Sequence, residues 1–392
     1  MSLKKIQMPQ GFKDIDEAVR AGVTLPEAIP IEPQAMESSP TTKGKPLIDF
    51  DEFVLRESSE DMEKKMLEDK FVLGRMAIMG QFTVFYASPN AGKTLIGLKL
   101  LTEAINTGEI DGSSVYYINA DDNYRGLVQK RGLCEEYGFN MLAPGHNGFQ
   151  ADRLVEIMRN AVVSGTSRGC IVILDTLKKF TDLMSKGASS SFGDVARSFV
   201  STGGTLIAYA HVNKNKGGDG LSIHAGTSDI SDDADCVYII DVVEDNGSFK
   251  TVTFRNTKDR GDVDQAVNYQ YKSKLNNPAL SYRELFDSVR SVSAGDAKVA
   301  GERAAIADTL VKNHEHIEAV LRYIWEAPTE VTKGDLTNLL QERELSKTKA
   351  TRLVEAHTGT DKHQGHRWNY VKGEKNAKHF IALQGGVWKT DF

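Results

Sequence analysis

Cysteine is scarce in this sequence: its 392 residues contain three, Cys134, Cys170 and Cys236, without the spacing of a metal-binding cluster. Cys170 and Cys236 lie in apolar runs typical of strands, which indicates reduced thiols in the core of a cytoplasmic protein. No apolar run approaches the roughly 18 residues that a membrane-spanning helix needs. The N-terminus, MSLKKIQMPQGFKD, has no apolar stretch behind its charges. We therefore expect neither a secretory signal nor a membrane partner.

Positive charge is not in excess either. The 48 lysines and arginines are outnumbered by 54 aspartates and glutamates, which gives a formal net charge of -6 at pH 7. This balance excludes a chain that is basic throughout and coats nucleic acid. Any contact with DNA must therefore come from local basic patches.

Prolines are few, and they concentrate near the N-terminus. Six of the 10 lie between positions 9 and 46, together with the polar stretch SSPTTKGKP. These features predict that residues 1–45 form a disordered N-terminal segment or linker, with one short helical pattern inside residues 11–29.

Residues 46–275 have the pattern of an α/β domain. Short runs rich in β-branched and aromatic residues alternate with segments of helical spacing. Because continuous apolar strands between helices are buried on both faces, we expect a central, mostly parallel sheet covered by helices. The expected strands are 82–86, 114–119, 170–175, 205–210, 236–241 and 250–256, and the expected helices are 93–106, 124–137, 151–164 and 192–202.

Residues 276–304 are polar and predict a linker, and residues 305–392 predict a small second domain. Helical patterns at 314–325, 333–343 and 347–356 precede two strand-like runs, HRWNYVKG and HFIALQG. Three helices followed by a β-hairpin predict a winged helix-turn-helix.

The strongest chemical signal is FTVFYASPNAGKTLIGLKLLTEA (82–104), where an apolar strand leads through a short loop into an amphipathic helix. This is the context that a Walker A phosphate-binding loop requires. Backbone N–H groups of such a loop converge on the phosphates of ATP. Lys93 would place its charge between the β- and γ-phosphates, and the Thr94 hydroxyl would bind Mg²⁺. The alternative is a chance match in a surface loop.

One residue departs from the Walker A pattern. Ala87 replaces the first glycine, and its methyl group is tolerated only if the backbone need not adopt a positive φ angle. The residues expected to hold the nucleotide are Ala87, Ser88, Pro89, Asn90, Ala91, Gly92, Lys93 and Thr94.

Acidic residues end two of the expected strands. Asp175 follows the apolar run CIVIL, where a Walker B carboxylate holds Mg²⁺. Thr176, not a glutamate, comes next. In this respect the chain resembles the RecA-like ATPases, which place the catalytic base after the second strand. Asp121 is the candidate there, with Asp122 as the alternative, and either residue could instead cap the following helix.

Residues 70–275 resemble the RecA-like hexameric replicative DNA helicases, in the RepA/DnaB-like branch of plasmids and phages. The resemblance is carried by ASPNAGKT, YINADD, VILDTLKKF and TLIAYAHVNKNKGGDG, followed by AGTSDISDDADCVYII. It implies a RecA-like P-loop core that uses ATP and Mg²⁺, a homo-hexameric ring and single-stranded DNA in the central channel. Residues 11–29 resemble the end of the Toprim domain of primases, which would make this chain the helicase part of a primase-helicase.

The same resemblance implies roles for residues around the central channel. His211 takes the place of the residue that senses the γ-phosphate, although a structural histidine at a strand end is the plainer interpretation. Lys214 and Lys216 lie in a flexible, positively charged loop suited to a phosphate backbone. Lys186 lies in a second candidate loop, residues 181–193, and both loops could instead be solvated surface loops.

The segment TFRNTKDRGDV (253–263) resembles the last strands of these helicases. By that resemblance, Lys258 and Arg260 reach the γ-phosphate bound by the neighbouring subunit, where a guanidinium stabilises the charge of the transferred phosphoryl group. Arg255 is an alternative, and a surface charge cluster is the plainer interpretation.

The C-terminal domain carries a local basic patch. Residues 346–379 contain 8 positive and 3 negative side chains, a net charge of +5 in a chain that totals -6. Lys347, Lys349 and Arg352 lie on the expected recognition helix, which favours contact with DNA, although winged helices also dock proteins.

Three functions fit these features. The first is a DNA helicase or translocase in replication that hydrolyses ATP between the subunits of a ring, with a primase or an initiator as a further partner to consider. The second is a regulatory or recombination ATPase of the RecA/RadA/KaiC type, which should lack the arrangement of Lys258 and Arg260. The third is a DNA-binding replication initiator that uses ATP as an assembly switch.

Overall fold

The structure is a computed structural model. It describes residues 69–183, 185–212, 229–372 and 378–383, and before them the short stretches 4–5, 19–22, 24, 29–30, 50 and 54–62. The chain divides into two units, Met1–Lys65 and Met66–Phe392. In the first, strands β1 (Lys4–Lys5) and β2 (Ile29–Pro30) pair antiparallel. The predicted disorder of residues 1–45 lies mostly outside the described residues.

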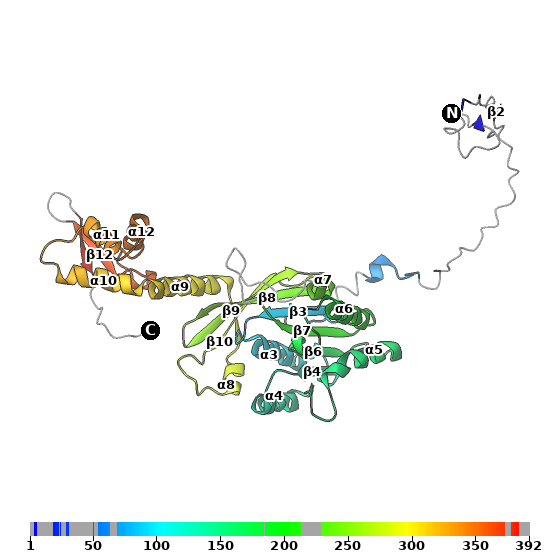
Figure 1. The fold of residues 1–392 in the computed structure, drawn as a ribbon. Helices are drawn as coiled ribbons and strands as arrows, with labels where there is room; N and C mark the ends of the chain where they lie inside the picture. The colour runs from blue at the N-terminus through cyan, green and yellow to red at the C-terminus, as the bar shows by residue number, and fades with distance from the viewer. Residues whose placement is uncertain are drawn as a thin grey trace. The chain divides into compact units, whose positions relative to one another are not determined.

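The second unit contains a large sheet whose strands were mostly predicted. Its strands are β3 Phe82–Ala87, β4 Val115–Asn119, β5 Asn140–Leu142, β6 Ile171–Asp175, β7 Thr205–His211, β8 Cys236–Asp245, β9 Phe249–Lys258, β10 Ala266–Lys272 and β11 Arg290–Val292. Their order is β11-β10-β9-β8-β3-β7-β6-β4-β5 (Figure 1). The part from β8 to β5 is parallel, and β9, β10 and β11 are antiparallel. The predicted α/β class with a mostly parallel sheet is therefore confirmed.

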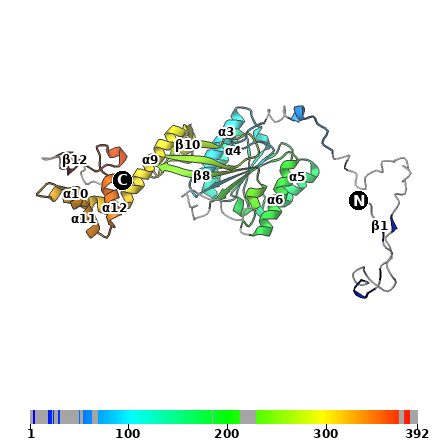
Figure 2. The same cartoon turned by 90° about the horizontal axis from the view of Figure 1, so that it is seen from above.

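Helices cover both faces of this sheet. They are α3 Lys93–Asn106, α4 Tyr124–Tyr137, α5 Leu154–Ser164, α6 Lys186–Ser201, α7 Asp229–Asp233, α8 Tyr282–Asp287 and α9 Ala294–Lys312. Figures 1 and 2 show α3, α4 and α8 together and α5 beside α6, in agreement with the contacts between these elements.

The sequence of β3 shows how the sheet is built. All six of its residues are buried, because alternate side chains enter two different hydrophobic clusters. Phe85 packs in the cluster that contains residues of α3 and α4, whereas Val84 and Tyr86 pack in the cluster that contains residues of α5 and α6. Burial on both faces explains the continuous apolar run.

Residues 276–304 do not form the predicted linker. They contain α8, β11 and the first half of α9, and β11 extends the sheet by pairing with β10. Two serines of this polar segment are helix caps. Ser281 caps α8 in a capping box with Glu284, and the side chain of Ser293 accepts from the Asp296 N–H at the start of α9.

The C-terminal residues form the predicted three helices and hairpin. They are α10 His314–Glu326, α11 Lys333–Glu342, α12 Lys347–Ala356, β12 Trp368–Lys372 and β13 Lys378–Ala382, the last two paired antiparallel. A separate hydrophobic cluster holds them, with Trp368 fully buried at its centre. The indole N–H of Trp368 donates to the Val354 carbonyl at 3.1 Å, so this polar atom is not left unpaired in the core.

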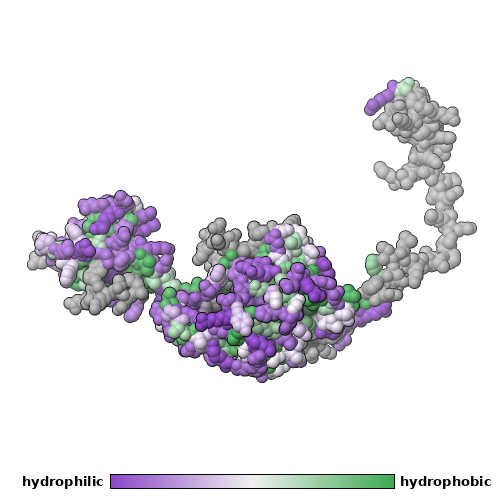
Figure 3. Space-filling model, turned by 60° about the horizontal axis from the view of Figure 1, so that its bottom comes forward, coloured by the Kyte–Doolittle hydropathy of each residue, from purple (hydrophilic) through white to green (hydrophobic). Residues whose placement is uncertain are grey.

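Among the residues that the structure describes, no helix is both long and apolar enough to cross a membrane. On the face seen in Figure 3, hydrophilic side chains predominate and hydrophobic ones are scattered among them.

Candidate functional site

The loop between β3 and α3, residues 88–92, has an unusual backbone that its sequence permits. Asn90 and Gly92 have positive φ angles of 61° and 89°. A Cβ atom at Gly92 would lie 2.7 Å from the Tyr271 ring, so glycine is required there on two grounds. Ala87 is the last residue of β3 and is not among the residues with positive φ, so the condition for its methyl group is met.

Two residues from distant strands hold this loop. The Lys250 ammonium and the Tyr271 hydroxyl donate to the Asn90 carbonyl at 3.3 and 3.4 Å. Both contacts turn that carbonyl toward β9 and β10. The sequence offered no signal for either residue, because they lie 160 and 181 positions away from Asn90.

The carboxyl edge of the parallel strands brings Lys93, Thr94 and Asp175 together. The Thr94 hydroxyl donates to Asp175 Oδ2 at 2.7 Å, and the Lys93 ammonium lies 3.8 Å from Asp175 Oδ1. Asp175 is buried, and the side chain of Lys93 is only 12% exposed. A buried carboxylate beside an ammonium and a hydroxyl is stable only as part of such a polar cluster.

A tyrosine that the sequence analysis missed completes this cluster. The Tyr117 hydroxyl on β4 donates to Asp175 Oδ2 at 2.8 Å, from a fully buried side chain. Burial, and then the negative charge of Asp175, raise the pKa of Tyr117 well above its ordinary value. This hydroxyl therefore remains a hydrogen-bond donor at any physiological pH.

The structure distinguishes the two acidic residues after β4. Asp122 accepts from the Asn119 amide at 2.7 Å and forms an ion pair with Lys130, so its carboxylate is already engaged. Asp121 is exposed. Of the two, Asp121 is the one whose carboxylate is open to solvent at this edge.

His211 ends β7, beside the last residue of β3, in register with Ala87. Burial lowers the pKa of its imidazole, and the positive charges of Lys93 and Lys178 lower that pKa further. The ring is therefore neutral at pH 7. The negative charge of Asp121 has the opposite, smaller effect and raises the pKa of His211.

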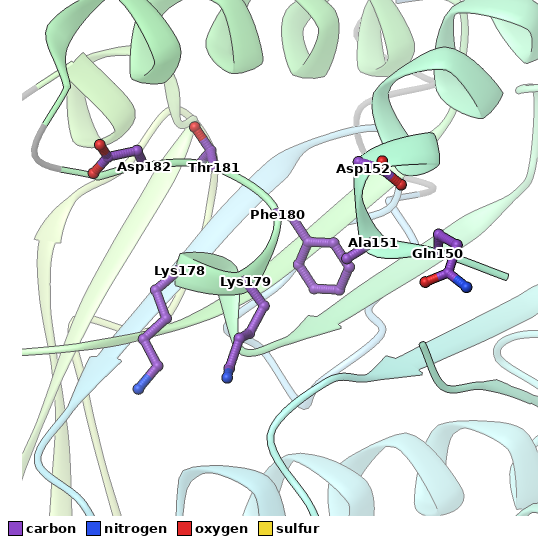
Figure 4. A pocket seen from close by; sticks show the side chains of 8 residues that line it. All are labelled: Gln150, Ala151, Asp152, Lys178, Lys179, Phe180, Thr181 and Asp182. Carbon is purple, nitrogen blue, oxygen red and sulfur yellow. The ribbon is translucent and has the colours of Figure 1, made fainter. Parts of the chain in front are cut away.

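Two lysines follow Asp175 in a short 3-10 helix, Leu177–Lys179. Lys178 and Lys179 are exposed and project in the same direction, and they line a pocket of about 620 Å³ with Gln150, Asp152 and Phe180 (Figure 4). They add positive charge next to the cluster around Asp175.

The predicted loop at 181–193 is wrong in its second half. Helix α6 begins at Lys186, and the Ser185 side chain caps it by accepting from the Ala188 N–H. Small polar residues in ASSSFG, which resemble a loop by composition, are accommodated here in a capped helix. The side chain of Lys186 and the whole of Lys214 and Lys216 lie outside the described residues.

Lys258 and Arg260 lie at the opposite edge of the sheet. Lys258 pairs in register with Val237 near the start of β8, and its ammonium donates to the carbonyls of Ser231 and Asp232. Arg260 contacts Asp235 Oδ1 at 3.2 Å. Asp235 in turn accepts from the N–H of Phe82, the first residue of β3.

Strand β3 therefore separates the two groups, over roughly 16 Å for six residues. Lys258 and Arg260 do not join Lys93 within one chain. Arg255, the alternative, lies on β9 within 3.5 Å of Asp241.

Toward the C-terminus, Lys347, Lys349 and Arg352 are exposed on α12. Residues that share this helix with them, Ala350, Leu353 and Val354, are buried in the local core. The helix is thus anchored by its apolar side chains, and its three basic side chains are exposed around the rest of its surface.

If these basic side chains bind DNA, replacing Lys347, Lys349 and Arg352 by alanine in the full chain should weaken duplex binding. The slope of log K against log salt should fall by about 2.7, three phosphate contacts at roughly 0.9 each. Fluorescence anisotropy with a labelled duplex over a salt series measures both, with Lys298→Ala on α9 as the control. An unchanged slope would contradict contact between α12 and the DNA backbone.

No protein-family model matches this sequence, and a search of curated proteins finds no significant match.

Proposed function

We propose that this chain is an ATP-hydrolysing P-loop protein with a RecA-like core, and that it is a DNA helicase or translocase that acts on single-stranded DNA. The observation that carries this proposal is the convergence of Lys93, Thr94 and Asp175 at the carboxyl edge of a parallel sheet. Open α/β sheets bind their ligands at this edge. The loop that precedes Lys93 has the positive φ angles that turn backbone N–H groups toward an anion.

Thr94 and Asp175 are suited to magnesium. The Thr94 hydroxyl donates a hydrogen bond to Asp175, so the oxygen lone pairs of Thr94 remain for a metal ion. In the described part of the chain, no group of three or more His, Cys, Asp and Glu side chains could hold a metal by itself. A site with one hydroxyl and one carboxylate fits Mg²⁺, which keeps several waters and takes phosphate oxygens as ligands. When bound, Mg²⁺ neutralises charge on the phosphates.

Three other side chains at this edge have separate roles in hydrolysis. The Lys93 ammonium is 3.8 Å from Asp175, too far for a hydrogen bond, so it is available to a phosphate. Asp121 orients the attacking water with its exposed carboxylate. His211, neutral and next to Ala87, senses the terminal phosphate by a hydrogen bond.

The position of Lys258 and Arg260 supports assembly. They lie at the amino edge of the strands, so they cannot complete the site of their own chain. A neighbouring copy could present them to this site, which favours ATP hydrolysis at subunit interfaces of a ring, proposed as a homo-hexamer.

A second candidate is supported by the exposed basic side chains of α12. If helices α10 to α12 and the hairpin form a winged helix, α12 is its recognition helix, and the chain would be a DNA-binding initiator with a slow ATP switch. Duplex binding without DNA-stimulated turnover would favour it.

The decisive measurement is Mg²⁺-dependent ATP hydrolysis by the full chain, with and without single-stranded DNA. We expect single-stranded DNA to stimulate turnover and Lys214→Ala with Lys216→Ala to reduce that stimulation while leaving basal turnover unchanged. Turnover that is indifferent to DNA would favour the regulatory ATPase. A chain that neither binds nor hydrolyses ATP would overturn the P-loop assignment.

A further inference from the structure

Tyr117 occupies a central place beneath the cluster around Asp175. It lies in the middle of β4, in register with Ile173 of the neighbouring β6, and its side chain reaches the end of that strand. Both Tyr117 and Asp175 are buried, at 0% and 2% exposure, so solvent cannot replace their hydrogen bond.

The two oxygens of Asp175 have different surroundings. Oδ2 accepts from the Tyr117 hydroxyl at 2.8 Å and from the Thr94 hydroxyl at 2.7 Å. Oδ1 lies 3.8 Å from the Lys93 ammonium, which is longer than a hydrogen bond. Two donors on one oxygen fix the rotation of the carboxylate and leave the other oxygen turned toward Lys93.

We propose that Tyr117 is a positioning residue that fixes the orientation of the Asp175 carboxylate beside Thr94 and Lys93, and thereby sets the affinity of the site for Mg²⁺. This inference rests on the proposed function, since it assigns Asp175 to the Mg-nucleotide. Thr94 alone cannot fix the carboxylate in the same way, because its oxygen is itself a ligand in that assignment. Tyr117 touches neither substrate nor metal and acts only through Asp175.

Two other tyrosines near this site do not make the same contact with Asp175. Tyr116, the preceding residue, is 40% exposed and points to the other face of the sheet. Tyr209 on β7 is also buried near Asp175, but a Cβ atom at Gly97 would overlap its hydroxyl, so that hydroxyl packs against α3. Of these three tyrosines, Tyr117 is therefore the one that donates to the carboxylate.

Tyr117→Phe tests this role, because it removes one oxygen atom and keeps the ring in the core. We expect the Mg²⁺ concentration for half-maximal ATP hydrolysis to rise about tenfold, as for the loss of a hydrogen bond to a charged group. The affinity for ATP in the presence of EDTA should stay unchanged, since Lys93 and the β3–α3 loop are intact. Isothermal titration calorimetry and phosphate release over a Mg²⁺ series measure the two quantities.

Tyr238→Phe is the matched control. Its hydroxyl is also buried and donates to a backbone carbonyl, that of Asp264, at 2.6 Å, but in β8 and away from Asp175. If both variants melt at a lower temperature and neither changes the Mg²⁺ dependence, Tyr117 has only a structural role and the proposal is wrong. Failure of the proposed function gives a different result, because the wild-type chain itself would then show no Mg²⁺-dependent nucleotide binding.

Discussion

Lys93→Ala should lower ATP hydrolysis by at least about a hundredfold. The loss of one group that stabilises developing charge in a desolvated site costs about that much or more. Lys93 is 12% exposed and lies between the β3–α3 loop and Asp175, where no other cation of the described residues contacts that carboxylate. Water cannot replace its charge at such a position. Steady-state phosphate release measures the effect.

Lys99→Ala is the control for this prediction. Lys99 lies on the same helix, α3, and forms an i,i+4 ion pair with Glu103 at 3.6 Å. Such pairs contribute only about 0.3–0.5 kcal/mol to stability. Lys99→Ala should therefore keep wild-type turnover, and comparable hydrolysis by Lys93→Ala and Lys99→Ala would refute the assignment of the phosphate site.

Arg260→Ala should have an equally large effect, roughly a thousandfold loss of hydrolysis, if the residue acts as an arginine finger on the neighbouring subunit. Its position at the amino edge of the strands gives the prediction a second part. Mixed with wild-type chains, the variant should lower ATP hydrolysis by more than its fraction of the mixture, because each variant copy inactivates the site of a neighbouring subunit. Titration of the mixture at constant total protein measures this inhibition.

Arg197→Ala separates a finger from a structural ion pair. Arg197 contacts the same Asp235 oxygen as Arg260, at 2.6 Å, so removal of either arginine weakens the same cluster. If activity in the Arg260→Ala mixture falls in a straight line, or if Arg197→Ala reproduces its effect, Arg260 serves the fold and not the neighbouring site.

Local patterns were sufficient for most of the fold. Helices 93–106 and 124–137 were predicted at their observed bounds, because their ends coincide with strong signals such as Gly92, the Asn123 cap and Gly138. The antiparallel strand β10 and the three-residue strands β5 and β11 were missed. Three residues are too few to establish a period, and β11 depends on the edge of β10 rather than on its own sequence.

The candidate site was predicted only for residues that belong to short, recognisable sequence patterns. Two patterns were enough to predict that Lys93, Thr94 and Asp175 lie together. One is GKT between a strand and a helix, and the other is an aspartate at the end of another strand. Asp121 and Asp122 could be distinguished as candidate bases only from the structure. There, Lys130 of α4 forms an ion pair with Asp122 and leaves Asp121 as the candidate. The role of Tyr117 could not be predicted, because the sequence of an apolar strand does not show which of its side chains contacts a buried carboxylate on the neighbouring strand.

The short strand β11 has a practical consequence for anyone who divides this chain. A truncated protein that stops at residue 275, where the composition suggests a boundary, would lack β11. Asn268, Tyr269 and Gln270 of β10 would then lose their strand partners on that side. An unpaired strand edge is a template for pairing with strands of other molecules, so such a protein would aggregate for a reason unrelated to the stability of its core. Helix α9 would be lost as well, together with the two hydrogen bonds that the Arg303 guanidinium donates to the buried Glu244 carboxylate of β8.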